Sequence, residues 1–172
     1  EARSASKCKH ANIITVYDFG VHQEHTPYMA MEFLEGESLQ SLMKRQKYLT
    51  LTDVIQLLTP VASALQVIHR QGMIHRDIKP GNIFIERSND DIQVKLLDFG
   101  LAFFHESQSE ESGVIGTPTY MAPEQILRQT LSPQTDIFAL ASIVYYCLSG
   151  RSPLPRNVPS LEALVMRAQG IE

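Results

Sequence analysis

The sequence has 172 residues, of which 44% are hydrophobic and 20% are charged, a composition typical of a folded domain and unlike that of a disordered chain. A formal net charge of -4 argues against the broad positive surface of nucleic-acid-binding proteins, so we expect no nucleic-acid partner. Cys8 and Cys147 lie far apart without metal-ligand spacing, which argues against a disulfide framework or a zinc site and favours a reducing, cytoplasmic location.

The two ends of the chain lead us to expect a segment of a longer protein. The sequence opens on Glu1, without a methionine and without the charged and apolar stretches of a targeting leader. Its longest apolar run, residues 137–148, is shorter than the stretch of about 20 residues that crosses a bilayer. We therefore expect no membrane segment within this chain, although the parent protein could be anchored to a membrane elsewhere.

The N-terminal part of the sequence predicts a small sheet followed by a long helix. Residues 13–19 and 28–33 have the content of strands, with turn-forming residues between them. Apolar residues then recur at helical spacing over 53–70, with Thr52 as the expected N-cap. Pro60 lies inside this pattern, where a proline removes a helix donor, so we expect a kink there.

A hairpin and a mainly helical body are predicted next. Two short apolar strands, 82–85 and 93–97, flank the polar residues 86–91, which are expected to form the turn. Ser132, followed by a proline, is typical of a helix start, and the apolar run 137–148 after it predicts a buried helix that stops at Gly150. This order of strands and then helices indicates an α+β fold.

The predicted hairpin brings together groups that suit phosphoryl transfer. Such a reaction needs a group that orients the attacking hydroxyl, oxygen ligands for Mg²⁺, and a cation near the migrating phosphoryl group. Asp77 can accept or orient the hydroxyl proton, and Lys79 can supply the cation. Asn82 and Asp98 are expected to lie side by side because they occupy neighbouring ends of the two strands, where their oxygens suit Mg²⁺.

Three motifs occur in the order that protein kinases use. They are His-Arg-Asp at 75–77, Asp-Phe-Gly at 98–100 and Ala-Pro-Glu at 122–124. The sequence therefore resembles the eukaryotic-like, or Hanks-type, serine/threonine protein kinases. The resemblance implies transfer of the ATP γ-phosphate to serine and threonine hydroxyls of protein substrates. It assigns Asp77 as the catalytic base and Asn82 with Asp98 as the Mg²⁺ ligands.

The same resemblance predicts a kinase domain that is only partly present. Residues 1–33 are similar to the remnant of a small N-terminal lobe, with part of an antiparallel sheet and the end of helix C. Residues 34–172 are similar to the hinge and most of a mainly helical C-terminal lobe, up to an expected last helix at 160–168. The Gly-rich loop, the ATP-binding lysine and the final helices of the family fall outside, so we expect this segment alone to be inactive.

Residues near the N-terminus resemble the nucleotide site of the family. Residues 26–36 are similar to the strand and hinge that hold adenine. The resemblance makes Met31 the gatekeeper and gives backbone contacts with the base to Glu32 and Leu34. Glu1 is similar to the helix C glutamate that pairs with the ATP-binding lysine, and Lys79, Asn82 and Asp98 complete the expected contacts with ATP.

The resemblance also implies a substrate class and a peptide-docking role for the activation segment, which ends at the Ala-Pro-Glu motif at 122–124. Lys79, together with the Gly-Thr-Pro-Thr-Tyr run at 116–120, resembles the serine/threonine branch of the family, and Lys79-Pro80-Gly81-Asn82 resembles its bacterial members. Thr117 is similar to the hydroxyl that ties Asp77 and Lys79 to the peptide-binding loop. Glu124 is similar to the glutamate that forms a buried salt bridge with an arginine beyond this segment.

Regulation is also implied by the resemblance. Arg76, beside the catalytic aspartate, is the family feature associated with control by activation-loop phosphorylation. Ser109 and Ser112 are the expected phosphorylation sites in that loop. Asp136 resembles the aspartate that braces the backbone of the catalytic loop, and His75 is expected to pack internally against Phe99 rather than to catalyse.

Two other functions remain open from the sequence. A small-molecule phosphotransferase of the same superfamily also places an aspartate and an asparagine around Mg²⁺, but Arg76, Lys79 and residues 116–124 argue against it. A pseudokinase that acts as a binding module is the second alternative. The presence of Asp77, Asn82 and Asp98 argues against it.

Overall fold

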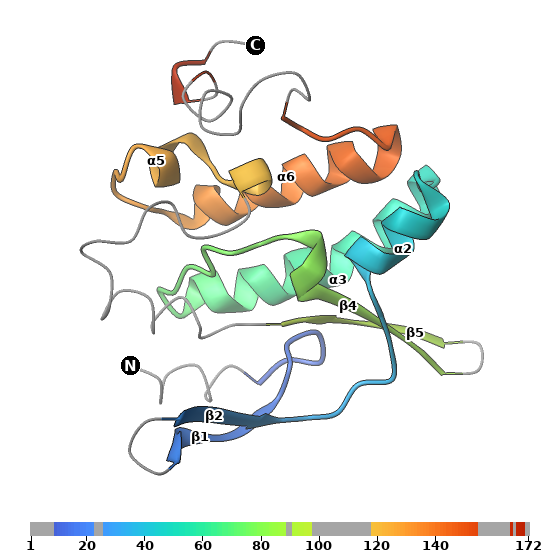
Figure 1. Cartoon of the computed structure of the whole chain (residues 1–172), viewed down its shortest axis with the longest axis vertical. Coiled ribbons are helices and arrows are strands. Elements are labelled where there is room, and N and C mark those ends of the chain that lie inside the picture. The colour runs from blue at the N-terminus through green and yellow to red at the C-terminus, as the bar shows by residue number, and fades with distance from the viewer. Residues whose placement is uncertain are drawn as a thin grey trace.

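The described part of the chain forms two small antiparallel sheets and a layer of helices (Figure 1). In this computed structural model it comprises residues 9–22, 26–88, 91–97, 118–154, 166 and 168–170. One sheet has the order β1-β2 and the other β3-β4-β5. Figure 1 shows the β1-β2 hairpin at one end of the molecule and α6 toward the other, with α3 and the second sheet between them. The α+β prediction is confirmed.

The strands of the first sheet have the predicted lengths, but β1 lies three residues later in the sequence than predicted and β2 two residues earlier. β1 (Val16–His22) pairs antiparallel with β2 (Thr26–Met31). The predicted strand at 13–19 is wrong at its start, because Ile13 and Ile14 contact the second sheet and do not pair with β2. Ile13 forms an isolated bridge with Leu96, the Ile14 amide donates to the Leu96 carbonyl at 3.0 Å, and both isoleucine side chains are buried.

The cap of the long helix differs from the prediction by two positions. After β3 (Gly36–Ser38) and α2 (Leu39–Gln46), α3 spans Leu51–Arg70. Its N-cap is Thr50 and not Thr52: the Asp53 amide donates to Thr50 Oγ1, and the Thr50 amide donates to Asp53 Oδ2, both at 3.2 Å. This reciprocal pair satisfies two amides at the helix start, which Thr52 inside the first turn cannot do. The helix assignment runs unbroken through Pro60, and the expected kink stays a prediction.

The two strands of the hairpin extend further toward each other along the sequence than predicted. β4 (Ile83–Ser88) pairs with β5 (Asp91–Leu96) from the Ile83–Leu96 pair out to the Ser88–Asp91 pair. The turn predicted over 86–91 is therefore wrong, because the polar residues at both of its ends continue the antiparallel ladder. The base of the hairpin follows the short 3-10 helix η1 (Pro80–Asn82).

The C-terminal elements place one apolar face against the core. They are the 3-10 helix η2 (Pro118–Tyr120), α5 (Pro123–Ile126) and α6 (Pro133–Ser149). The predicted N-cap at Ser132 and the stop at Gly150, which has a φ of 65°, are confirmed for α6. The helix predicted to be buried is buried on one face, at Thr135, Asp136, Ala139, Ile143 and Cys147, while Ile137, Tyr145 and Leu148 of the apolar run are exposed. Most of the helix expected at 160–168 lies outside the described residues.

The core sits between α3, α6 and the second sheet. α3 contributes seven buried side chains to it: Val54, Leu57, Leu58, Val61, Ala64, Leu65 and Ile68. Among the described residues, α3 is also the one helix long and apolar enough to cross a membrane. Its apolar face has a protein partner, however, since those seven residues belong to the same core cluster as Ile143 and Cys147 of α6. Burial raises the pKa of the Cys147 thiol to about 12, so this cysteine stays protonated at neutral pH.

Candidate active site

Asp77, Lys79 and Asn82 form one polar cluster in the loop between α3 and β4. Lys79 Nζ donates to Asp77 Oδ2 at 2.6 Å, and Asn82 Nδ2 donates to the same oxygen at 3.0 Å and to the Asp77 backbone carbonyl at 2.9 Å. The Asp77 side chain keeps 41% of its surface exposed. Both side-chain bonds end on Oδ2, so a hydroxyl that approaches Oδ1 displaces neither of them. The cluster therefore combines an accessible carboxylate with an adjacent cation.

Asn82 is held so that its side-chain oxygen suits a metal ion. The residue is 4% exposed, and its Nδ2 is committed to the two bonds with Asp77, which directs Oδ1 the other way. The Leu97 amide donates to the Asn82 carbonyl at 2.8 Å, so the end of β5 lies directly beside it. Asp98 follows Leu97 in the chain but lies outside the described residues. The side-chain oxygens of Asn82 and Asp98 are hard donors of the kind that Mg²⁺ prefers.

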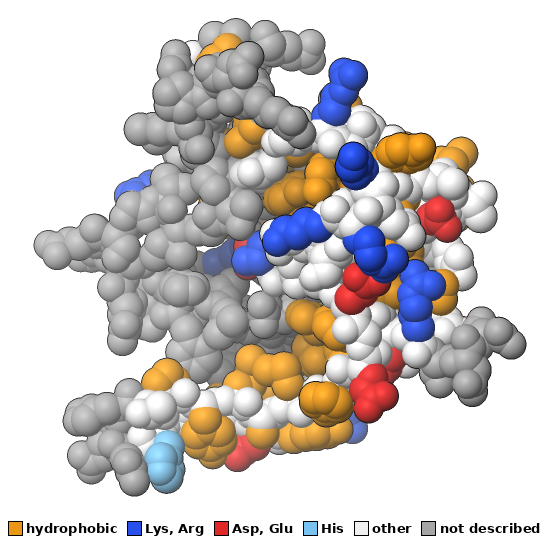
Figure 2. Space-filling view, turned by 45° about the vertical axis from the view of Figure 1, so that its right-hand side comes forward, with side chains coloured by type: hydrophobic (Ala, Val, Ile, Leu, Met, Phe, Trp, Pro, Cys, Tyr) orange, Lys and Arg blue, Asp and Glu red, His pale blue; other side chains and the backbone are white. Residues whose placement is uncertain are grey.

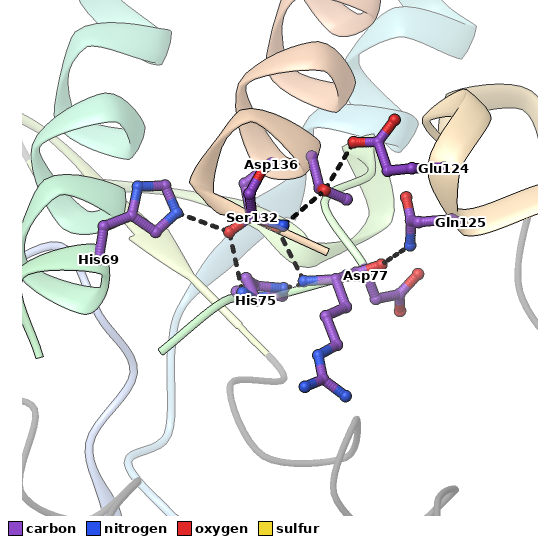
Figure 3. Close-up of polar contacts among 9 residues, drawn as sticks. His69, His75, Asp77, Glu124, Gln125, Ser132 and Asp136 are labelled. Atoms are coloured by element: carbon purple, nitrogen blue, oxygen red, sulfur yellow. Dashed lines mark hydrogen bonds and ion pairs between the residues drawn. The ribbon is translucent and has the colours of Figure 1, made fainter. Parts of the chain in front are cut away.

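Asp136 braces the loop that carries this cluster, as predicted (Figure 3). It lies in the first turn of α6 and is 1% exposed. Its Oδ2 accepts from the His75 amide at 2.9 Å and contacts His69 Nε2 at 2.7 Å, while Oδ1 accepts from the Arg76 amide at 2.8 Å. A buried carboxylate needs such partners, because an unpaired charge away from water is costly. Both amides before Asp77 are thus fixed by one side chain.

His75 has a structural position, in agreement with the prediction. It is 1% exposed, and its Nε2 lies 3.0 Å from the Leu97 carbonyl, which connects the loop to the end of β5. Its predicted contact with Phe99 lies outside the described residues. Arg76, the next residue, has a φ of 70°, a region that side chains other than glycine rarely adopt. The bonds around Arg76 therefore hold a conformation that costs free energy.

The predicted hinge connects β2 to β3, and Glu32 within it uses its side chain as well as its backbone. Glu32 is paired through both carboxylate oxygens with Lys95 Nζ, at 2.8 and 2.9 Å, and also accepts from the Thr15 amide at 2.7 Å. Its own amide donates to the Thr15 carbonyl, so its carbonyl is the backbone group left for a base. Met31 is 39% exposed, and Leu34 is half-buried.

The environment of Glu32 fixes its protonation state. Partial burial alone favours the neutral acid, but the Lys95 ammonium and the Thr15 amide outweigh this effect and lower the pKa of Glu32 below its ordinary value. The stabilisation is therefore present above the pKa of the unfolded chain and is lost as the pH falls through the lower, folded-state pKa. The ion pair joins the hinge to β5 at neutral pH.

Lys95→Met tests this link, because methionine keeps the apolar stem and removes the ammonium. We expect a loss of about 1–2 kcal/mol in the free energy of unfolding at pH 7, as for a hydrogen-bonded charge pair. The difference from wild type should shrink when the pH falls below the glutamate range. Denaturant titrations at both pH values measure it, with Lys44→Met on the exposed end of α2 as the control. A constant difference at both pH values contradicts the role of Glu32.

Glu124 has a different partner from the predicted arginine. Thr135 Oγ1 donates to Glu124 Oε1 at 2.7 Å and accepts from the Ser132 amide at 3.3 Å. The start of α6 is therefore bonded to α5 within the described part of the chain. The salt bridge between Glu124 and a later arginine stays a prediction.

The structure brings some predicted residues together and does not describe others. Asp77, Lys79 and Asn82 converge, and Arg76 and Glu124 lie on the adjacent loop and helix. Five predicted residues lie outside the described part of the chain: Glu1, Asp98, Ser109, Ser112 and Thr117. Reasoning from the sequence missed the roles of His69, Lys95, Gln125 and Thr135. Lys95 alone carried a local signal, since a charged residue in an apolar strand requires a partner.

Comparison with known proteins supports the same interpretation. Residues 1–170 match the protein kinase domain family. The chain is 38% identical over 159 residues to serine/threonine-protein kinase PknA of Mycobacterium tuberculosis. The aligned residues cover 89% of this chain and 36% of the relative. It is 39% identical over 173 residues to Pkn1 of Myxococcus xanthus, covering 98% and 24%, and 33% identical over 165 residues to human ULK1, covering 92% and 16%.

These relatives are longer proteins, and the chain spans about a third or less of their length. The match nevertheless extends over almost the whole of this chain. It includes the loop with Asp77 and the helices α5 and α6 that contact this loop. The three motifs, the braced catalytic loop and the family match agree. The chain belongs to the protein kinase domain family.

Proposed function

We propose that the full-length protein transfers the γ-phosphate of ATP to serine and threonine hydroxyls of protein substrates. The observation that carries this proposal is the Asp77–Lys79–Asn82 cluster, whose side chains lie 2.6–3.0 Å apart on a loop braced by Asp136. The names of the bacterial and human relatives support the serine/threonine specificity.

Each residue of the cluster has a role in the proposed reaction. Asp77 accepts a hydrogen bond from the substrate hydroxyl and orients it toward the γ-phosphorus. It takes the hydroxyl proton as the new oxygen–phosphorus bond forms and the bond to the ADP leaving group breaks. Lys79 holds Asp77 in place and supplies positive charge near the migrating group. Asn82, with Asp98, would hold Mg²⁺, which when bound neutralises charge on the phosphate oxygens.

The nucleotide would bind between the hinge and this cluster. In the proposal, the Glu32 carbonyl and the Leu34 backbone contact adenine, while Met31 borders the pocket. Glu1 pairs with a lysine upstream of this segment. We also propose a cytoplasmic site of action, where ATP is available and the buried thiol of Cys147 stays reduced.

Incubation of the full-length protein with labelled ATP, Mg²⁺ and a generic protein substrate tests the proposal. We expect label on serine and threonine and none on tyrosine, as shown by phosphoamino-acid analysis. A protein that binds ATP without any transfer would instead act as a pseudokinase, and transfer to aminoglycosides or other small alcohols would identify a small-molecule phosphotransferase. Either result overturns the proposal.

Asn82→Ala gives a more local test of the metal site. We expect the Mg²⁺ concentration at half-maximal rate to rise about tenfold or more, because one of the two protein oxygens on the metal is lost. A Mg²⁺ titration of the initial rate measures this shift. Asn12→Ala is the control, since Asn12 bonds the Val94 carbonyl away from the cluster. An unchanged Mg²⁺ dependence in Asn82→Ala contradicts the ligand role.

A further inference from the structure

Gln125, the residue after the Ala-Pro-Glu motif, joins α5 to the loop that carries Asp77. It lies in α5, and both ends of its side-chain amide are bonded. Its Oε1 accepts from the Ala122 amide at 3.1 Å. Its Nε2 donates to the Arg76 carbonyl at 2.8 Å, 49 residues away in the sequence (Figure 3). One side chain thus connects the segment that precedes α5 with the residue before Asp77.

The bond with Arg76 falls at the most constrained point of the loop. The φ of 70° at Arg76 is unfavourable for a residue with a side chain, so neighbouring bonds must hold it. Asp136 of α6 accepts from the Arg76 amide at 2.8 Å, and Gln125 of α5 donates to its carbonyl. The peptide groups on both sides of Arg76 are therefore fixed from two different helices. Asp77 is the next residue, so its direction depends on both contacts.

We propose that Gln125 is a positioning residue that couples peptide docking to the orientation of Asp77. This inference rests on the proposed function and on the peptide docking that the family resemblance implies for the segment ending at the Ala-Pro-Glu motif. A peptide docked on that segment would fix the position of the Ala122 amide. Because Gln125 bonds both this amide and the Arg76 carbonyl, the position of the Arg76 carbonyl would be fixed as well, and Asp77 would be held toward the substrate hydroxyl. Gln125 itself contacts neither substrate nor nucleotide.

The position requires a side chain that donates and accepts at the same time. An amide does both, whereas an ionised carboxylate can only accept. In Gln125→Glu the carboxylate would face the Arg76 carbonyl oxygen, and two acceptors repel. When that carboxyl is protonated, its hydroxyl can donate to Arg76 as the amide does. Gln125→Met keeps a similar length and makes neither bond at any pH.

The test compares three variants of the full-length protein between pH 5 and 8. We expect Gln125→Glu to lower kcat for a peptide substrate about tenfold at pH 8, as for the loss of one net hydrogen bond, with KM for ATP unchanged. Its kcat relative to wild type should recover as the pH falls. Gln125→Met should be impaired equally at every pH. Gln129→Glu, which adds the same charge at an exposed position, should match wild type.

Neighbouring titratable groups do not explain such a pattern. Those near Gln125 are Arg76 and Asp77 on the loop, Tyr120 before α5, Glu124 on α5 and Asp136 on α6. All five are present in wild type and in every variant, so the ratio of rates at each pH removes their direct titration. What remains is the titration of the introduced carboxyl.

Thermal unfolding gives a readout that does not require activity. The introduced carboxyl should have a raised pKa in the folded protein because its charged form faces a carbonyl oxygen. The folded variant is then favoured at low pH and loses stability as the pH rises. The Tm of Gln125→Glu should therefore lie further below that of wild type at pH 8 than at pH 5.

Two outcomes overturn the inference in distinguishable ways. An active wild type with an unchanged kcat in Gln125→Glu, or with a loss that does not depend on pH, overturns the positioning role and leaves the proposed function intact. A wild type without phosphoryl transfer, combined with the pH-dependent Tm deficit, overturns the proposed function and reduces Gln125 to a structural link.

Discussion

Replacement of Asp77 by asparagine is expected to lower kcat of the full-length protein by about 10²–10⁴-fold, the range for a lost general base. Asparagine has nearly the same shape and can still hydrogen bond, but it cannot take a proton. The exposed Asp77 carboxylate is the group that meets the hydroxyl in the proposed reaction, and its Oδ2 is already anchored by Lys79 at 2.6 Å.

The accompanying measurements separate chemistry from binding. ATP affinity should change little in Asp77→Asn, because in the proposed function the hinge holds adenine, and Asn82 and Asp98 hold the metal. Steady-state rates and equilibrium nucleotide binding test both statements. Asp91→Asn, at the exposed start of β5, is the matched control and should keep the wild-type kcat. Equal kcat for wild type and Asp77→Asn contradicts the role of the carboxylate.

The second large effect is expected at Asp136, because this one carboxylate satisfies three groups of the loop and of α3. Asp136→Ala leaves the His75 and Arg76 amides and the His69 ring without their bonds, within 2.7–2.9 Å of a lost acceptor. Two of these donors are backbone groups in a largely buried site, where each lost bond costs about 1–3 kcal/mol. We expect the free energy of unfolding to fall by about 3–5 kcal/mol.

Asp136→Asn should lower the free energy of unfolding by a smaller amount. It keeps one oxygen for the Arg76 amide, so the loss should be smaller than in Asp136→Ala. Denaturant unfolding of both variants measures the difference, with Asp91→Ala as an exposed control. The kcat of Asp136→Ala should also fall, since Arg76 loses the bond from its amide to Asp136 that offsets its unfavourable φ of 70°. An Asp136→Ala protein as stable as wild type contradicts the bracing role.

Sequence reasoning identified the catalytic loop because its information is local. The short spacing between Asp77, Lys79 and Asn82 puts them on one turn, and the hairpin brings Leu97 to Asn82, where the structure has a 2.8 Å bond. Hairpin pairing of two neighbouring apolar strands follows from alternation and turn chemistry. This part of the site was therefore predictable without coordinates.

The remaining contacts depend on side chains that no local pattern brings together. Gln125 reaches Arg76 across 49 residues and Lys95 reaches Glu32 across 63, so nothing in either neighbourhood names the partner. Element boundaries failed for a different reason: Thr50 and Thr52 are equally good cap residues, and only the reciprocal bonds with Asp53 distinguish them. The apolar character of Ile13 and Ile14 reflected burial rather than strand pairing.

Figure 2 shows a face of the described protein on which lysine and arginine side chains alternate with acidic and apolar ones. No continuous basic field covers this face, in keeping with the formal net charge of -4. With this net charge, we expect a phosphate-containing ligand to be recognised by local positive charge. In the proposed function, Lys79 and the bound metal provide that local positive charge beside Asp77.

A crystal structure of the full-length protein with Mg²⁺ and a non-hydrolysable ATP analogue is the most direct test of the central claim. We expect the metal about 2.1 Å from Asn82 Oδ1 and from a carboxylate oxygen of Asp98. The γ-phosphate should lie beside Lys79, with Asp77 Oδ1 facing the space in front of it. A metal bound without Asn82, or a nucleotide whose γ-phosphate points away from Asp77, would contradict the account.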